Sequence, residues 1–326
     1  MLGIPRVTAV IPHWNRRDLL QILLANLAEQ TRPFDEIIVA DNGSSDDSVP
    51  VARHAGATVV ELGANLGFAT AVNRGVNAAQ GEWVAILNND VTLAPDWLET
   101  LLATNADFST GKILNAQNRT VIDGTFDELA FSGCACRCGS GQPDGPLWNV
   151  RREIRMAPMT AALFRKDLFT ELGGLDERFG SYLEDVDFGL RCALAGRPGV
   201  YEPRAVAWHR GSATLGQWKN DTVFHISRNQ VLLSAKHLRR QEYWNLLAGQ
   251  LLWGLLAIRH ACGWAFCKGK FAGLRDVRRY KLEHHNEASR YRLRAILEAS
   301  EESILALGRD SKLDQYWRYY FWLSRW

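Results

Sequence analysis

The stretch Gly81–Asp90, GEWVAILNND, decides the fold because it joins an uninterrupted apolar run to an acidic turn. The run Trp83–Leu87 is short and bounded by polar residues, and this pattern predicts a buried β-strand. The turn Asn88-Asn89-Asp90 would place a carboxylate and two amides at the carboxyl end of that strand. A carboxylate in such a place can hold a divalent cation.

Strands and helices alternate on the N-terminal side of this stretch. Strand-like runs occupy Val7–Pro12, Glu36–Ala40 and Thr58–Glu61, and apolar residues at helical spacing occupy Asp18–Gln30 and Gly67–Ala79. Alternation at this interval predicts an α/β fold, with a parallel, Rossmann-like sheet and helices on both of its faces.

Ligands of such sheets bind beyond the carboxyl ends of the strands. Asp41 follows one predicted strand and opens the turn-rich segment Asp41–Asp47, while Asp90 follows another. We therefore expect Asp41 and Asp90 to open into one crevice.

The second half of the chain has a less regular pattern. Residues 105–155 are rich in Asn, Gly, Asp and Cys, which favours a long functional loop or irregular β-structure. A second acidic cluster, Glu184–Asp187, follows later. From Phe224 onward the pattern is helical, with an expected break near Lys268–Gly273.

Charge is distributed unevenly along the 326 residues. Residues 1–224 carry 20 Lys/Arg and 27 Asp/Glu, whereas residues 225–326 carry 18 and 9, although the whole chain has a net charge of only +2. Half of the 12 tryptophans also fall within 225–326. A basic, Trp-rich tail suits an anionic membrane surface, and it is equally compatible with a helical domain that has a solvated basic face. No nucleic-acid-binding motif accompanies the charge, so we expect no nucleic-acid partner.

The N-terminal residues lack the charged and then apolar pattern of a signal peptide, so a cytoplasmic location is expected. The most apolar later segment, Tyr243–Phe266, contains Asn245, Gln250, Arg259 and His260, which makes it a costly membrane span. A buried or interfacial helix is expected there instead.

Six cysteines are present, three of them in Cys134-Ala135-Cys136-Arg137-Cys138. In an extended segment the middle thiol would oppose the outer two, which is poor geometry for a tetrahedral zinc site. Reduced loop thiols are the favoured interpretation.

Several segments, in a consistent order, resemble the family-2 glycosyltransferases of the GT-A fold. These segments are Val7–Asn15, Asp41–Asp46, Asn65–Ala69 with Asn73 and Gly75, Leu87–Asp90, Gly173–Glu177, Tyr182–Asp187, Arg191 and Trp208–Ser212. The resemblance implies a catalytic domain over 1–224, with a donor-binding part over about 1–104 and an acceptor and catalytic part over about 105–224. Residues 225–326 would form a helical C-terminal extension.

The resemblance places Asn88-Asn89-Asp90 at the family's Asp-x-Asp motif. Asp90 would then bind Mn²⁺ or Mg²⁺ on the donor diphosphate, and Asn88 and Asn89 would contact the nucleotide. Here Asn88 replaces the first aspartate of the motif, which removes one charge. The alternative is an Asx turn that only closes a strand.

Asp41 corresponds to the residue that reads the base in this family, where it accepts a hydrogen bond from an imide N–H of uracil or thymine. Pro12 and Asn15 would flank the same pocket. An alternative role is that Asp41 or Ser44 caps the following helix, and the two roles are compatible. Arg74 is a further candidate for a contact to the nucleotide.

The second cluster carries the general base, which the resemblance assigns to Asp185. This carboxylate would take the proton of an acceptor hydroxyl in a single inverting displacement. Glu184 is a candidate donor-site residue, although Glu184 and Asp187 could also simply favour the positive end of a helix dipole. His209 would complete the metal site, and the alternative for it is a packed core histidine.

The sequence therefore predicts an inverting, metal-dependent glycosyltransferase. The sequence near Asn65–Asp90 and Glu184–His209 is most similar to that of bacterial rhamnosyltransferases of cell-surface polysaccharide assembly. The first expected donor is therefore dTDP-rhamnose, and UDP-hexoses come next. The expected acceptor is a glycan or a lipid-linked glycan, reached from the inner face of the cell membrane. Two alternatives remain: an inactive glycan-binding or scaffold protein, and a nucleotidyltransferase, although the segment after the first strand lacks the Gly-rich loop that would grip a triphosphate.

Overall fold

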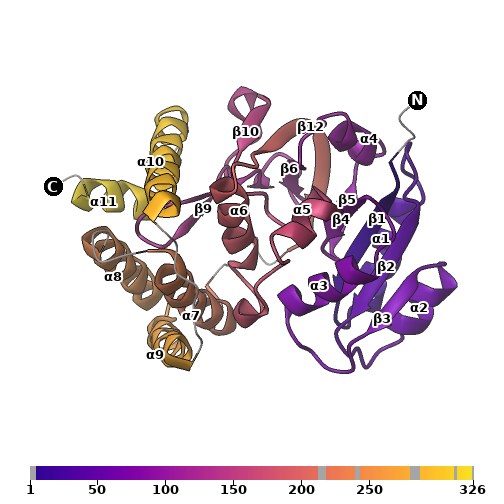
Figure 1. Ribbon diagram of the computed structural model, residues 1–326, viewed down its shortest axis with the longest axis horizontal. Helices are drawn as coiled ribbons and strands as arrows, with labels where there is room; N and C mark the ends of the chain where they lie inside the picture. Colours follow the sequence, from indigo (N-terminus) through magenta and orange to yellow (C-terminus); the bar gives the residue numbers. More distant parts are fainter. Residues whose placement is uncertain (1–4, 212–217, 239–242, 280–286, 312–313, 325–326) are drawn as a thin grey trace. The chain divides into compact units, whose positions relative to one another are not determined.

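A computed structural model of the protein describes residues 5–211, 218–238, 243–279, 287–311 and 314–324 (Figure 1). The chain forms two compact units, which are described separately. The first, called here the sheet unit, comprises residues 1–126 and 139–211, and the second, the helical unit, comprises residues 127–138 and 212–326. The boundary expected near residue 224 falls within helix α7 (Asn220–His237).

The sheet unit contains a ten-stranded sheet in the order β10-β12-β6-β11-β4-β1-β2-β3, in which β5 also pairs with β12 and β7 with β6. The strands are β1 (Val7–His13), β2 (Glu36–Asp41), β3 (Thr58–Glu61), β4 (Trp83–Leu87), β5 (Val91–Leu93), β6 (Phe108–Asn115), β7 (Ile122–Gly124), β10 (Arg152–Ile154), β11 (Ala161–Arg165) and β12 (Gly199–His209). Strands β1 to β4 run parallel, as predicted. Beyond them the sheet is mixed, because β11 lies antiparallel between β4 and β6.

Helices cover both faces of the sheet, which confirms the predicted α/β architecture. The helices of this unit are α1 (Arg17–Leu27), α2 (Ser48–His54), α3 (Phe68–Ala78), α4 (Trp97–Leu102), α5 (Lys166–Glu171) and α6 (Glu184–Leu194), with 3₁₀ turns η1 (Pro146–Trp148) and η2 (Glu177–Phe179).

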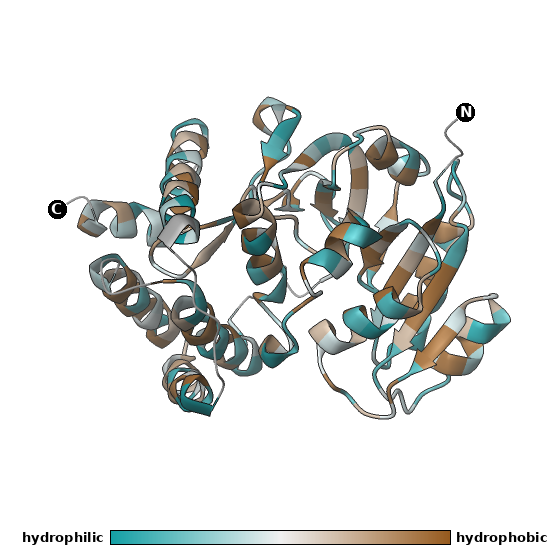
Figure 2. Cartoon of the chain, in the orientation of Figure 1, coloured by the Kyte–Doolittle hydropathy of each residue, from teal (hydrophilic) through white to brown (hydrophobic). Residues whose placement is uncertain are grey.

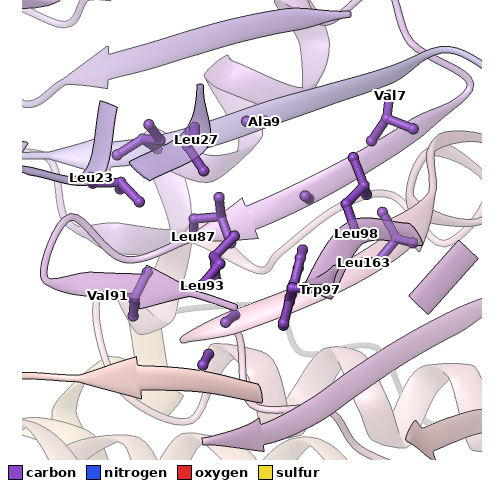
Figure 3. Packing of buried hydrophobic residues seen from close by; sticks show 14 of the residues in the cluster. Val7, Ala9, Leu23, Leu27, Leu87, Val91, Leu93, Trp97, Leu98 and Leu163 are labelled. Atoms are coloured by element: carbon purple, nitrogen blue, oxygen red, sulfur yellow. The ribbon is translucent and has the colours of Figure 1, made fainter. Parts of the chain in front are cut away.

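On one face, alternate residues of the strands pack against α1 and α4. Leu23 and Leu27 of α1 and Trp97 of α4 join Ala9 and Leu87 of the sheet in one buried cluster (Figure 3). The period-2 strand pattern and the period-3.6 helix pattern therefore meet in a single core.

On the other face, α3 approaches β1 closely because Gly75 has no side chain. A Cβ at Gly75 would lie 2.4 Å from Cγ1 of Val10. Farther along the same face, Phe164 of β11 contacts Phe169 of α5 and Phe188 of α6, with ring centroids 6.2 Å and 5.8 Å apart.

Residues 105–155 are more regular than predicted. All eight residues of β6 are buried in the interior of the sheet. Its apolar pattern is interrupted by polar residues such as Lys112, which is buried because its ammonium group pairs with Asp144 at 2.8 Å. A strand whose polar positions are satisfied by distant partners has no local sequence signature.

The helical unit combines the hairpin β8 (Asp127–Leu129) and β9 (Ala135–Arg137) with five helices. Besides α7 these are α8 (Tyr243–Arg259), α9 (Gly263–Arg279), α10 (Glu287–Asp310) and α11 (Gln315–Ser324). Cys134 lies in the loop between β8 and β9, as expected, and packs with aromatic residues of α11, including Tyr316 and Tyr320. All six cysteines of the chain are free thiols.

The helix break expected near Lys268–Gly273 is wrong, because α9 continues through it. Two glycines in this segment let α9 approach α7 closely. A Cβ at Gly269 would lie 2.4 Å from the carbonyl oxygen of Phe224, and one at Gly273 would lie 2.7 Å from that of Arg228. The chain breaks earlier, between α8 and α9, where Ala261 has φ 59°.

Hydropathy follows this architecture, with brown strands inside the sheet unit and mixed colouring on its helices (Figure 2). Within the described residues, no helix is both long and apolar enough to cross a membrane.

Candidate active site

Strands that run in the same direction end at one edge of the sheet. Strands β1, β2 and β4 are mutually parallel, and β6 and β12 share their direction because β11 is antiparallel to both β4 and β6. Asp41, Asp90 and His209 lie at or just after such ends. Asp41 and Asp90 therefore lie at the same edge of the sheet, and their opening into one crevice stays a prediction.

Asp41 closes a tight turn at the end of β2. Its Oδ2 accepts hydrogen bonds from the backbone N–H groups of Gly43 at 3.1 Å and Ser44 at 3.0 Å. Its Oδ1 is buried and has no hydrogen-bond partner among the described residues. Since a buried oxygen without a partner is costly, this atom is poised to accept a donor from a ligand.

The alternative in which Asp41 or Ser44 caps the next helix is wrong. Helix α2 starts at Ser48 and is preceded by Asp47, with no side-chain hydrogen bond at its cap. The turn residues are engaged with the first strand instead, because Oγ of Ser44 accepts the backbone N–H of Asn15 at 2.8 Å.

Asn15 also links the end of β1 to the turn after β2. Its Oδ1 accepts the backbone N–H of Ser45 at 2.9 Å, and both Asn15 and Arg16 have left-handed backbones, with φ of 54° and 62°. Pro12 is buried within β1, whereas the neighbouring Trp14 has half of its side chain exposed. The exposed indole is an aromatic surface that sequence reasoning did not single out.

His13 connects the turn after β4 to the start of α2, and it was also missed by sequence reasoning. Nδ1 of His13 lies 2.9 Å from Nδ2 of Asn89, and Nε2 lies 2.8 Å from Oγ of Ser48. Burial lowers the pKa of His13, although Asp41 and Asp46 oppose this. The ring is therefore neutral at pH 7, so that Nδ1 accepts from Asn89 and Nε2–H donates to Ser48.

This contact commits one N–H of the Asn89 amide to the protein itself. Asn88, the preceding residue, is fixed through its backbone, which donates to the carbonyl oxygen of Thr160 at 2.9 Å. The side chains of Asn88 and Asp90 are both half-buried. The turn is thus rigidly held on both sides, as a ligand-binding turn requires.

Asp90 and His209 are brought together by strand pairing. Val91 of β5 pairs with His209 of β12, and the backbone N–H of Arg210 donates to the carbonyl oxygen of Asp90 at 2.9 Å. Nε2 of His209 lies 3.1 Å from Oδ1 of Asp90. The two predicted metal ligands are therefore direct neighbours.

Asp123 of β7 completes this group and was not found from the sequence. Its Oδ2 lies 2.9 Å from Nδ1 of His209, and the residue is only 4% exposed. Burial lowers the pKa of His209, but its hydrogen bonds and charge interactions with Asp123 and Asp90 prevail and raise this pKa to about 9. Burial likewise raises the pKa of Asp90, yet the hydrogen bond and charge of His209 hold it below its usual value.

Asp90 and His209 place a carboxylate oxygen and an imidazole nitrogen 3.1 Å apart, and both are ligand types that Mn²⁺ accepts. The two side chains would therefore be the residues that hold such an ion. Within the described residues no group of three or more His, Cys, Asp or Glu side chains could hold a metal. Diphosphate oxygens and water would therefore have to supply the remaining ligands, as is common for Mg²⁺.

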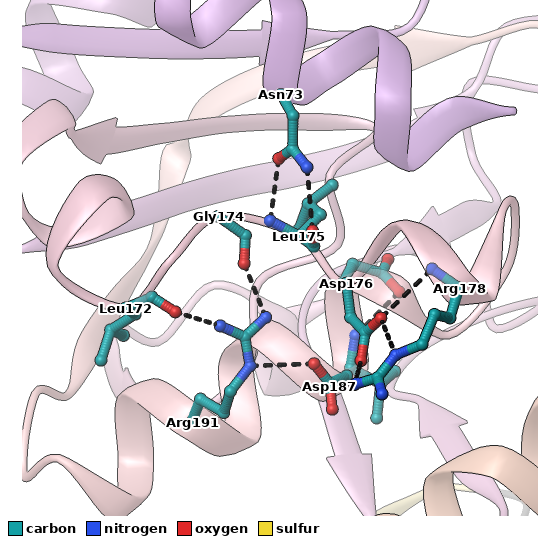
Figure 4. A network of polar contacts seen from close by, with 10 residues as sticks. Asn73, Leu172, Gly174, Leu175, Asp176, Arg178, Asp187 and Arg191 are labelled. Atoms are coloured by element: carbon teal, nitrogen blue, oxygen red, sulfur yellow. Dashed lines mark hydrogen bonds and ion pairs between the residues drawn. The ribbon is translucent and has the colours of Figure 1, made fainter. Parts of the chain in front are cut away.

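The second acidic cluster starts helix α6, and its three carboxylates differ in their surroundings. Glu184 is 5% exposed, and Asp185 is partly buried with its Oδ1 accepting the backbone N–H of Val186 at 2.9 Å. Asp187 is fully buried and pairs with Arg191 at 2.9 Å. Figure 4 shows that Arg191 also donates to the carbonyl oxygens of two loop residues, so Asp187 serves the structure of this loop.

Two residues with left-handed backbones precede the cluster. Tyr182 and Leu183 have φ of 74° and 67°, which is costly for side chains of this size. Such strain is maintained only where the surrounding structure fixes it, and it is common at functional sites. It turns the chain abruptly into α6 and so sets the position of Asp185.

The segment before Asp185 and the turn of Asp41 are anchored at the same helix start. The amide of Asn42 donates to the carbonyl oxygen of Gly67 at 3.1 Å, and the backbone N–H of Ala69 donates to that of Gly180 at 2.9 Å. Gly67 has φ 91°, and a Cβ there would lie 2.9 Å from the Gly180 oxygen. Only glycine fits this crossing.

Arg74 lies exposed on α3, away from the helix start. Its neighbour Asn73 bonds to both the N–H and the carbonyl oxygen of Leu175, each at 2.9 Å (Figure 4). The role of Arg74 in nucleotide binding stays a prediction.

Comparisons with known proteins agree with this geometry. The model of glycosyl transferase family 2 matches residues 8–130. The N-acetylglucosaminyl-diphospho-decaprenol L-rhamnosyltransferase of Mycobacterium tuberculosis is 28% identical over 273 residues, covering 74% of this chain and 87% of the relative. A glycosyltransferase assigned to teichuronic acid biosynthesis in Bacillus subtilis is 31% identical over 55% of this chain and 75% of the relative.

Solved structures show the same fold at lower identity. The mannosyltransferase PcManGT of Pyrobaculum calidifontis, solved with GDP-Man and Mn²⁺, has a TM-score of 0.54 and 19% identity over all of this chain and 88% of its own. GalNAc-T7, solved with UDP, GalNAc and Mn²⁺, has a TM-score of 0.61 and 14% identity over 86% of this chain and 58% of its own. With the family match and the relatives above, these similarities show that the chain is a family-2 glycosyltransferase of the GT-A fold.

Proposed function

We propose that this enzyme is an inverting, metal-dependent glycosyltransferase that moves a sugar from a nucleotide-diphosphate donor to a hydroxyl of a glycan or lipid-linked glycan. The observation that carries the proposal is the 3.1 Å contact between Asp90 and His209 at the strand edge that also bears Asp41. The edge thus combines a pair of metal-binding side chains with a buried acceptor atom.

Asp90 and His209 would hold the Mn²⁺ or Mg²⁺ ion. When bound, the ion neutralises the charge that develops on the departing diphosphate. Asp123 would orient His209 by accepting its Nδ1–H, which leaves Nε2 for the metal. Two solved relatives of this fold contain Mn²⁺, which supports the choice of ion.

Asp41 would select the base of the donor. Its unpaired Oδ1 is an acceptor, and the imide N–H of uracil or thymine is a donor of matching character. Pro12, Asn15, Asn88 and Asn89 would line the nucleotide site. With the rhamnosyltransferase of M. tuberculosis among the relatives, dTDP-rhamnose is the first donor to test and UDP-hexoses follow.

Asp185 would act as the general base. It would take the proton of the acceptor hydroxyl while that oxygen attacks the anomeric carbon from the face opposite the diphosphate. The new glycosidic bond forms as the bond from the sugar to the diphosphate breaks, so one displacement inverts the anomeric centre. The buried Glu184 would lie beside the donor.

The acceptor class is proposed by analogy. The M. tuberculosis relative is named for a diphospho-decaprenol acceptor, and a lipid-linked glycan is therefore the first acceptor class to test here. A cytoplasmic enzyme working at the inner face of the membrane would meet such an acceptor.

Calorimetric titration tests the donor site first. UDP, dTDP, GDP and CDP are each titrated with Mn²⁺ and again with EDTA. We expect one pyrimidine diphosphate to bind only with the metal, because Asp41 reads the base and Asp90 binds the metal. Absence of binding to all four would favour an inactive scaffold. Product analysis with the matching sugar donor then distinguishes sugar transfer, which releases a nucleoside diphosphate, from nucleotidyl transfer, which releases pyrophosphate.

A further inference from the structure

Helix α8 of the helical unit presents a continuous apolar stripe to solvent. Trp244, Leu247, Leu251, Leu255 and Ile258 are each between 57% and 68% exposed. Their spacing of three or four residues places them on one face of the helix. Large apolar side chains that are exposed singly need no explanation, but a contiguous row of five marks an interaction surface.

The opposite face of α8 is firmly packed, so the orientation of the stripe is fixed. Gly249, Gly254 and Ala257 are buried, and a Cβ at Gly249 would lie 2.2 Å from Cβ of Ser132. Gln250 donates to the carbonyl oxygen of Ser132 at 2.8 Å. The small and polar residues that interrupt the apolar pattern of α8 are therefore those that face the protein.

Helix α9 continues this surface with a mixed apolar and basic face. Trp264 and Phe271 are 72% and 75% exposed, and Nζ of Lys268 lies 5.3 Å from the centroid of a Trp264 ring. The two helices meet at their shared turn, where a Cβ at Gly263 would lie 2.8 Å from Cγ1 of Ile258. The exposed faces of α8 and α9 are called here the α8–α9 surface.

All exposed charges of α8 and α9 are positive. They come from Arg259, Lys268, Arg275, Arg278 and Arg279. The single acidic residue of the two helices, Asp276, is 6% exposed and pairs with Arg228 of α7 at 2.7 Å. Helix α10 is different, because it exposes charges of both signs, including Arg294 and Glu298, which pair at 2.9 Å.

We propose that the α8–α9 surface docks on the face of a lipid bilayer that contains anionic lipids. Leucine and isoleucine side chains would enter the boundary of the acyl chains, tryptophans would lie at headgroup depth, and the basic residues would meet anionic headgroups. The helices lie on the membrane rather than cross it, because neither is long and apolar enough to span it. A second copy of the chain fits poorly, since it would bring the same positive charges face to face.

Flotation of the full-length protein with vesicles tests this inference independently of the sugar-transfer reaction. The vesicles are made of phosphatidylcholine alone or of phosphatidylcholine mixed with phosphatidylglycerol. We expect binding to the mixed vesicles, much weaker binding to phosphatidylcholine alone, and a decrease with added salt. The variant L251E/L255E should bind to the vesicles at least about tenfold more weakly, because it places charges in the boundary of the acyl chains. The variant K268E/R275E should show a similar decrease in binding, but only with the vesicles that contain phosphatidylglycerol.

Matched controls lie on α10 of the same unit. Y291E changes a side chain that is 79% exposed, and R309E changes an exposed basic residue, so both should bind as the wild type does. Circular dichroism and nucleotide binding show whether each variant is folded. Equal binding of wild type to both vesicle types, or unchanged binding of L251E/L255E, would overturn the proposal. So would a concentration-dependent dimer that L251E/L255E abolishes while no vesicle binding occurs, since this would assign the surface to a second copy.

Discussion

Nε2 of His209 lies 3.1 Å from Oδ1 of Asp90, and its Nδ1 lies 2.9 Å from Oδ2 of Asp123. The three residues come from β12, the turn after β4, and β7, so the contact exists only because these segments meet at one edge of the sheet. The imidazole has one nitrogen for each carboxylate. The arrangement suits a metal ligand whose outer nitrogen is held by a supporting carboxylate.

Removing either proposed metal ligand should weaken metal-dependent donor binding. We expect Asp90→Ala and His209→Ala to weaken binding of the nucleoside diphosphate in Mn²⁺ by about ten- to a hundredfold, because each removes a ligand of the ion. Titration calorimetry measures this, with EDTA as the metal-free reference. If either variant keeps the full difference between Mn²⁺ and EDTA, its assignment as a ligand is wrong.

Asp123→Asn should affect the metal without removing a ligand. The amide can still accept the Nδ1–H of His209, but it loses the charge that increases the basicity of the ring. We expect Mn²⁺ affinity to fall by about ten- to a hundredfold, as measured by electron paramagnetic resonance titration. Asp144→Asn is the control, because Asp144 pairs with Lys112 and not with the histidine. Equal effects of the two substitutions would contradict a specific role for Asp123.

Asp185→Asn should separate chemistry from binding. Donor binding should persist, while turnover should fall by about a hundredfold or more, because the amide cannot accept the acceptor proton. Asp167→Asn is a close match, since Asp167 also lies in the first turn of a helix and accepts the N–H of the next residue, at 2.7 Å. Near-normal turnover of Asp185→Asn would remove it as the base.

Asp187→Ala should act on stability. Asp187 is fully buried in its pair with Arg191, so its removal leaves a largely enclosed guanidinium without its carboxylate. We expect the free energy of unfolding to fall by about 3–5 kcal/mol in urea denaturation. The exposed pair of Arg294 and Glu298 has the same spacing of four residues and the same 2.9 Å distance. Glu298→Ala should therefore cost only about 0.5 kcal/mol, and a similar loss in both variants would refute the argument from burial.

Lys270 should make stability depend on pH. Its ammonium group donates to Oε1 of Gln230 at 2.8 Å, and burial lowers its pKa from 10.5 to about 7, against the opposing charge interaction of Cys134. Between these two values the unfolded chain binds a proton that the folded chain lacks, so stability should increase with pH from about 7 towards 10.5. The slope due to this group is at most about 1.4 kcal/mol per pH unit.

The measurement is the difference in unfolding free energy between wild type and Lys270→Met at pH 7, 8 and 9. The difference cancels the contributions of other groups that titrate in this range. We expect the unfolding free energy of the wild type to increase relative to that of the variant as pH increases. A constant difference would show that the folded protein keeps Lys270 protonated.

The sequence by itself determined the first half of the sheet unit and the family. The apolar runs Val7–Pro12 and Trp83–Leu87 and the helical spacing before and between them are local signals, and local signals specify local structure. The order of the acidic turns then placed Asp41 and Asp90 at strand ends, because parallel strands joined by helices end at one edge.

Only the tertiary structure decided how the site is completed. Asp123 and His13 contact site residues that are far away in the chain, and no spacing in the sequence indicates such contacts. Strand β6 was hidden because its buried polar residues, such as Lys112, are satisfied by side chains beyond their own strand. The segment Lys268–Gly273 was expected to break the helix, but its glycines serve a close contact with α7. Periodicity reports which face of an element is apolar, whereas the choice of partner depends on packing between elements distant in sequence.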